Sequence, residues 1–166
     1  MKSKKILISS CLLGQIVRYD GKSSPCTHPV LQMWQAQNRF VPICPEVAAG
    51  LTVPRSPCEI KGPGDGRAVL AGKAQVVTQA GTLCSHAFLT GAQTALSLAI
   101  QHKITIAILK ASSPSCGNHF IYDGSFQGTR VAGMGVTAAL LAQHGIKIFN
   151  ETELEAALSY FNDSLE

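Results

Sequence analysis

The sequence of 166 residues has few charged side chains and no long cationic run, and both absences bear on its partners. Charged residues make up 14% and apolar residues 46%, a balance that excludes an intrinsically disordered chain. The net charge is only +4, and aromatic residues are not interleaved with lysine or arginine, so we predict no nucleic-acid partner. So few charges are also compatible with a surface that is partly covered in a homo-oligomer.

Long hydrophobic runs are missing as well. No stretch of 18 apolar residues is present, so we expect no membrane-spanning helix. The basic start MKSKK precedes only about five apolar residues before Cys11, which is too short for the hydrophobic region of a secretory signal. We therefore predict a cytoplasmic protein without membrane contact. The length fits a single domain that spans residues 1–166.

The third absence is that of closely spaced C-x-x-C pairs, although the chain contains six cysteines. Their absence argues against a zinc ribbon and against thioredoxin-like disulfide exchange. A chain with a full-sized core does not depend on disulfides for its stability. We therefore expect at least some of the thiols to serve in metal binding or catalysis.

Apolar runs alternate with segments of helical periodicity along the chain, which is typical of an α/β fold. The pattern predicts strands at 5–10, 39–43, 104–110 and 146–149, and helices at 29–37, 82–102, 133–144 and from 150 onward. Residues 68–77 suggest one or two further short strands, whereas 50–60, 62–66 and 119–130 read as loops and turns. We expect a single-domain, three-layer sandwich with a mainly parallel, Rossmann-like sheet.

A thiol follows each of three predicted strands. The segment ITIAILKASSPSCGN carries a buried strand into a turn-rich loop with Cys116, while Cys11 and Cys44 come at the ends of the runs at 5–10 and 39–43. The carboxyl ends of parallel strands form the binding crevice of an open α/β sheet, so these thiols are expected to meet there. The other cysteines do not follow this rule: Cys26, Cys58 and Cys84.

Three thiolates with one open position suit two kinds of centre. One is an iron-sulfur cluster with one iron that the protein leaves free, and the other is a catalytic zinc with an open fourth site. The spacing does not choose between them, and ordinary buried structural cysteines are a third interpretation.

Several motifs together resemble those of the thiouracil desulfidase family. They are SSCLLG with VRYDG, CPEVAAGL with PRSPCEI, KASSPSCG, and GMGVTAALLAQHGI, and the resemblance runs from Lys5 to about Glu153. It implies a 4Fe-4S cluster held by Cys11, Cys44 and Cys116, whose unique iron takes sulfur from a small thiolated base and releases it as sulfide without net redox change. Cys58 lies where the family pattern has no ligand, so it is either an extra thiol or a competitor for this assignment.

The remaining candidate residues follow from the chemistry of a C=S group. A soft thione sulfur suits an open iron that acts as a Lewis acid. Glu46, two residues after Cys44, is our candidate for the acid/base group that protonates the sulfur or a ring nitrogen and directs water, with a carboxylate bonded to loop amides as the alternative. Ser112 and Ser113 are candidates to hydrogen-bond substrate or sulfide, and loop capping is their alternative role.

Three weaker candidates for substrate binding complete the set: Asp20, Arg55 and Glu59. An Arg-carboxylate pair that fixes the loops is the alternative role for at least one pair among them. Two rival functions stay open at this point. One is a non-catalytic cluster-binding module that senses sulfide or redox state, and the other is a zinc hydrolase.

Overall fold

Four short parallel strands form the central sheet of the computed structural model, which describes residues 3–165. In spatial order they are β2 (Phe40–Ile43), β1 (Ile6–Ser9), β5 (Ile106–Ile108) and β8 (Lys147–Phe149). Pro42 is tolerated because β2 is an edge strand, where a missing ladder donor faces away from the sheet. The first two strands along the chain each run into one helical turn, η1 (Ser10–Leu13) after β1 and α2 (Pro45–Ala48) after β2.

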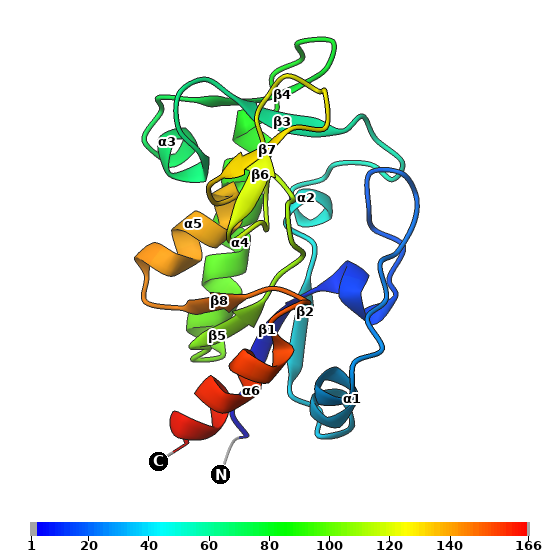
Figure 1. Ribbon diagram of the computed structural model, residues 1–166, viewed down its shortest axis with the longest axis vertical. Helices are drawn as coiled ribbons and strands as arrows, with labels where there is room; N and C mark the ends of the chain where they lie inside the picture. Colours follow the sequence, from blue (N-terminus) through cyan, green and yellow to red (C-terminus); the bar gives the residue numbers. More distant parts are fainter. Residues whose placement is uncertain (1–2, 166) are drawn as a thin grey trace.

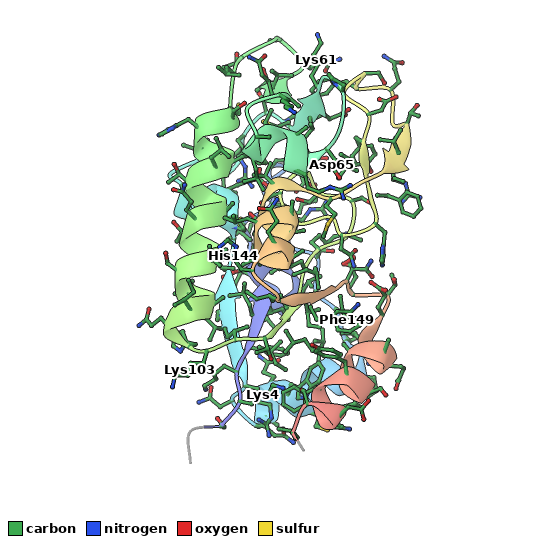
Figure 2. All side chains as sticks on the ribbon, turned by 90° about the vertical axis from the view of Figure 1, so that its left-hand side faces the viewer. Lys4, Lys61, Asp65, Lys103, His144 and Phe149 are labelled. Carbon is green, nitrogen blue, oxygen red and sulfur yellow. The ribbon has the colours of Figure 1, made fainter. Side chains whose placement is uncertain are left out.

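Helices cover both faces of this sheet, as alternate residues of one strand show. In β1, Ile6 and Ile8 pack with α1 (Pro29–Ala36) and α6 (Leu154–Asp163), whereas Leu7 packs with α4 (Ser85–Gln101) and α5 (Val136–Gln143). Figure 1 shows these two helical layers, and Figure 2 shows α4 and α5 side by side on one face. The predicted three-layer α/β sandwich with a parallel sheet is therefore confirmed. Within residues 3–165, none of the helices combines the length and the apolar character that crossing a membrane needs.

Antiparallel elements form a second region beyond the carboxyl ends of the sheet (Figure 1). Strands β3 (Cys58–Lys61) and β4 (Gln75–Thr78) pair there, with α3 (Gly66–Leu70) between them in sequence, and β6 (Phe120–Tyr122) pairs with β7 (Arg130–Ala132). A core of their apolar side chains joins this region to α4 and α5.

This second region is where the sequence-based prediction was wrong. Of the one or two strands predicted at 68–77, only β4 at 75–78 forms, whereas residues 68–70 belong to α3, because the Asp65 carboxylate accepts a hydrogen bond from Arg67 N at 3.0 Å and so caps that helix. The predicted loops at 50–60 and 119–130 contain β3 and the β6–β7 hairpin. Unlike the apolar runs of the central sheet, these short strands lie in segments rich in glycine, proline and polar residues, and pairing with a partner strand stabilises them more than their own local pattern indicates.

Polar side chains bind backbone groups at the starts of two helices, α6 and α4. In the turn before α6, Glu153 Oε1 accepts from Asn150 N at 3.1 Å and Asn150 Oδ1 accepts from Thr152 N at 2.9 Å, and the helix itself begins only at Leu154. Helix α4 begins at Ser85. The Ser85 hydroxyl accepts from Val76 N of β4 at 2.9 Å and so ties the helix start to the antiparallel region.

Candidate active site at the carboxyl ends of the sheet

A cavity of about 730 Å³ opens where β1, β2 and β5 end. Its floor comes from the segments that follow these strands, and its other walls come from the start of β3 and from the β6–β7 hairpin. This is the crevice at which open α/β sheets bind their ligands.

The three cysteines that follow strands line this cavity together. Cys11 lies in η1 and Cys44 precedes α2, while Cys116 lies in the loop after β5. Burial raises the pKa of the Cys11 thiol to about 11, against the charge of Lys110 and with a contribution from Cys44. Burial also raises the pKa of Cys116 to about 12, and Cys44 and Cys11 add to the shift. The three thiols therefore lie near enough to act on one another electrostatically.

The donor set is chemically suited to an iron-sulfur cluster. All three cysteines are free thiols, and Cys11 and Cys116 are 7% and 5% exposed, so little water competes for them. Thiolates are the ligands that iron-sulfur clusters take in proteins, and bound iron offsets the cost of ionising buried thiols. Among the described residues, no group of three or more His, Cys, Asp and Glu side chains is spaced to hold a single metal ion. A cluster places fewer demands on close spacing, because each thiolate binds its own iron.

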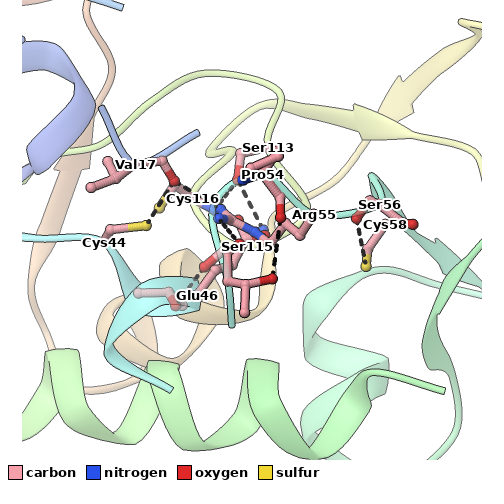
Figure 3. A network of polar contacts seen from close by, with 12 residues as sticks. Val17, Cys44, Glu46, Pro54, Arg55, Ser56, Cys58, Ser113, Ser115 and Cys116 are labelled. Carbon is pink, nitrogen blue, oxygen red and sulfur yellow. Dashed lines mark hydrogen bonds and ion pairs between the residues drawn. The ribbon is translucent and has the colours of Figure 1, made fainter. Parts of the chain in front are cut away.

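Glu46 and Arg55 form a nearly buried ion pair in the cavity wall (Figure 3). Arg55 Nε donates to Glu46 Oε1 at 3.2 Å, and the two side chains are only 8% (Arg55) and 17% (Glu46) exposed. Burial raises the pKa of the Glu46 carboxyl, and Arg55 offsets part of that shift. A carboxyl group with a raised pKa can hold a proton closer to neutral pH, which suits a general acid.

Arg55 also binds loop backbone. Its Nη2 donates to Val17 O at 3.0 Å and its Nη1 to Thr52 O at 3.1 Å, while Arg55 N donates to Tyr19 O at 2.8 Å. The Cys44 thiol donates to the same Val17 oxygen at 3.8 Å. Arg55 is therefore a loop-fixing residue, and its carboxylate partner is Glu46 rather than Asp20 or Glu59.

Asp20 is not brought to the cavity with the other candidates. Its carboxylate lies 3.6 Å from Arg18 Nη2 and accepts from Lys22 N at 3.0 Å, so it stabilises its own turn. Glu59 does line the cavity, and it binds backbone there: Oε1 accepts from Gly124 N at 3.0 Å and from Phe126 N at 3.2 Å.

Both candidate serines line the cavity next to Cys116. Ser113 Oγ accepts from Ser115 N and Cys116 N, each at 3.1 Å, so its lone pairs cap the Cys116 loop while its proton is left to donate. Ser112 Oγ accepts from Arg130 Nη1 at 3.2 Å, and the Ser112 backbone has a φ of 66°.

Close backbone contacts hold two of the thiol loops. A Cβ on Gly91 of α4 would overlap the Pro45 carbonyl group, and a Cβ on Gly135 would lie 2.8 Å from Cys116 N. Only glycine allows α4 to approach the Cys44 loop, and only glycine allows the start of α5 to approach the Cys116 loop.

The sequence analysis missed three polar residues of the cavity. Lys110 Nζ lies 3.6 Å from Glu151 Oε1, and Lys110 N donates to Ser9 Oγ at 2.9 Å. Ser9 is the last residue of β1, and Lys110 and Glu151 follow β5 and β8, respectively, by two residues. The rule that located the cysteines would have located these residues too.

The other three cysteines differ from this group in their surroundings. Cys58 lines the cavity, but burial and then the neighbouring Cys84 thiol are what raise its pKa to about 12. Cys26 is partly buried against the core beneath α1 and α6.

Comparison with known proteins agrees with this geometry. Residues 6–153 match the family model described as 2-thiouracil desulfurase. The chain belongs to the 2-thiouracil desulfurase family. The match spans almost the whole segment over which the motifs resemble that family, so the resemblance is confirmed.

Two relatives of this desulfurase family member cover nearly its whole length. The uncharacterized protein YbbK of Bacillus subtilis (strain 168) is 41% identical over 153 residues, which is 92% of this chain and 99% of YbbK. The structure of the 4Fe-4S-dependent thiouracil desulfidase TudS (DUF523Vcz) superposes with a TM-score of 0.88 at 41% identity and covers 96% of this chain and 99% of TudS.

Proposed function

We propose that this protein is an iron-sulfur-dependent desulfurase that converts a thiolated base of the 2-thiouracil or 4-thiouracil type to the oxo base. Water supplies the oxygen and the sulfur leaves as hydrogen sulfide, so C=S and H₂O give C=O and H₂S without net redox change. The observation that carries the proposal is that thiols from three strand ends line one cavity beside the buried carboxyl group of Glu46, in a member of the 2-thiouracil desulfurase family.

Cys11, Cys44 and Cys116 would hold the 4Fe-4S cluster, which leaves one iron without a protein ligand. When bound, the cluster supplies a soft Lewis acid for the thione sulfur. Side chains of the protein then handle the proton and the water. Glu46 holds a proton for the sulfur or a ring nitrogen and afterwards orients water toward the carbon, and Arg55 keeps that carboxyl group in place.

Ser112 and Ser113 would contribute hydrogen bonds on the Cys116 side of the cavity. The Ser113 hydroxyl accepts two backbone hydrogen bonds, which orients its proton away from the loop and toward a ligand. Lys110 adds a positive charge near Cys11 and so favours the anionic sulfide product. A single domain, a homo-oligomer and a cytoplasmic location stay predictions.

The test is an anaerobic preparation analysed for visible absorbance, iron, acid-labile sulfide, and sulfide release from 2-thiouracil and 4-thiouracil. We expect a brown protein with about four irons per chain that turns over at least one of these bases. Cys11→Ser, Cys44→Ser and Cys116→Ser should each lose cluster and turnover, whereas Cys26→Ser is the matched control that keeps both. A fully active Cys116→Ser protein would overturn the ligand set, and a loaded wild type that releases no sulfide would leave a binding module.

A further inference from the structure

Phe126 is a partly buried aromatic residue in the loop between β6 and β7. It lines the same cavity as the three thiols, from the loop of the β6–β7 hairpin. Within residues 3–165 it belongs to none of the three hydrophobic clusters, and no aromatic pair or cation–π contact includes it. An aromatic ring that packs against no core is available to a ligand.

The backbone at Phe126 is held in an unusual conformation. Its φ is 58°, in the left-handed region that bulky side chains rarely adopt. Such a conformation persists only where the surroundings impose it, and such positions concentrate at ligand-binding sites.

Glu59 imposes it. One oxygen of this buried carboxylate accepts from both Gly124 N (3.0 Å) and Phe126 N (3.2 Å), and Asp123 N donates to Thr129 O at 3.0 Å, which closes the loop. A Cβ on Gly124 would lie 2.7 Å from Ile60 O, so the loop rests directly on β3. Glu59 thus anchors the loop to a rigid strand and fixes where Phe126 stands.

We propose that Phe126 stacks on the ring of the base and is the residue that selects planar heteroaromatic substrates, with Glu59 as its positioning residue. This inference rests on the proposed function. A cavity of about 730 Å³ is much larger than a pyrimidine, so polar contacts at one wall do not fix the ring by themselves. An aromatic face on another wall orients the ring for the thiol side, and every pyrimidine offers a π face to it.

The test compares binding of uracil and dihydrouracil to the cluster-loaded protein by calorimetry. The two ligands share the same carbonyl and N–H groups, but dihydrouracil has no planar aromatic ring. We expect wild type to prefer uracil, and Phe126→Ala and Phe126→Leu to weaken uracil binding about 5- to 100-fold while changing dihydrouracil binding little. Phe126→Tyr should restore the preference, and Phe120→Leu, on an exposed residue of the same hairpin, is the matched control.

For Glu59, the readout is a split between KM and kcat. Glu59→Gln keeps one carbonyl acceptor for the two N–H groups, so it should retain most of the uracil preference that Glu59→Ala loses. In Glu59→Ala we expect KM for the thiolated base to rise far more than kcat falls, with iron content unchanged. Iron content and unfolding temperature of each variant show that the fold survives.

An equal uracil preference in wild type and Phe126→Leu would overturn the inference, as would a wild type that binds neither ligand. These binding measurements do not need turnover. A protein that releases no sulfide but shows the Phe126-dependent preference would contradict the desulfurase proposal and leave the stacking residue standing.

Discussion

Gly91→Ala tests whether helix packing sets the position of two central residues of the proposed site. Gly91 lies on α4 against Pro45, the residue between Cys44 and Glu46. A Cβ at this position would lie 2.7 Å from the Pro45 carbonyl carbon and closer still to its oxygen, so reaching an ordinary contact of 3.4 Å requires a shift of at least about 0.7 Å.

The short helix α2 is the part that must move. Helix α4 has 17 residues and buries Phe88, Ala92, Ala95 and Ala99 in two clusters, whereas α2 has four residues. Overpacking costs about 1–3 kcal/mol, and replacing a helical glycine by alanine returns about 1 kcal/mol. The net loss of about 0–2 kcal/mol lowers Tm by only a few degrees in a protein of this size.

The effect on chemistry should be much larger than the effect on stability. A displacement approaching 1 Å at a catalytic group lowers rate by about 100-fold, and here it acts on the proposed cluster ligand Cys44 and on the proposed acid/base group Glu46 together. The assay measures sulfide release, iron per chain and Tm of Gly91→Ala beside Ser97→Ala, an exposed position of the same helix that should match wild type. Wild-type turnover with full iron content in Gly91→Ala would refute the reasoning.

Two further changes probe the same site, and a third probes the start of α3. Glu46→Gln keeps an acceptor for Arg55 and should retain the cluster spectrum while turnover falls about 10²- to 10⁴-fold; unchanged turnover would remove Glu46 from the mechanism. Gly135→Ala would press on Cys116 N and should lower iron content on reconstitution, and normal loading would show that the loop yields without consequence. Burial on its own raises the pKa of the Asp65 carboxyl group, but hydrogen bonds from Arg67 and Met134 N outweigh burial and hold the pKa below the ordinary 3.8. Its contribution is therefore present above pH 3.8 and lost as pH falls through the depressed pKa, so the deficit of Asp65→Asn in denaturant unfolding, about 1–2 kcal/mol at pH 7, should shrink in acid.

The thiol positions could be predicted from sequence because parallel strands all end at one edge of a sheet. A buried strand shows itself by its apolar run, so Cys11, Cys44 and Cys116 could be placed at that edge without knowing any contact. Glu46 could be placed at the same edge because it is two residues from Cys44. These inferences needed only short-range pattern and one topological rule.

The roles of the loop residues could not be predicted in the same way. Whether Arg55 meets Asp20, Glu46 or Glu59 depends on how loops far apart in sequence fold against one another, and no local pattern carries that information. Asp20 was expected at the substrate, but its nearest neighbours, Arg18 and Lys22 N, satisfy it within its own turn. Phe126 was not predicted as a site residue, because a single aromatic residue in a loop belongs to no periodic pattern that would indicate which way its side chain faces.

Arg55 explains how the site keeps its shape when the thiols ionise. In the free protein, Val17 O accepts from both the Cys44 thiol and the Arg55 guanidinium group. In the proposed cluster site, a Cys44 thiolate bound to iron would have no proton to donate, so its hydrogen bond to Val17 would be lost on loading. The bonds from Arg55 to Val17, Thr52 and Glu46 do not depend on that proton, because guanidinium stays charged. Arg55 therefore holds the loop before Cys44 and the carboxyl group after it in one arrangement, whether or not the cluster is bound.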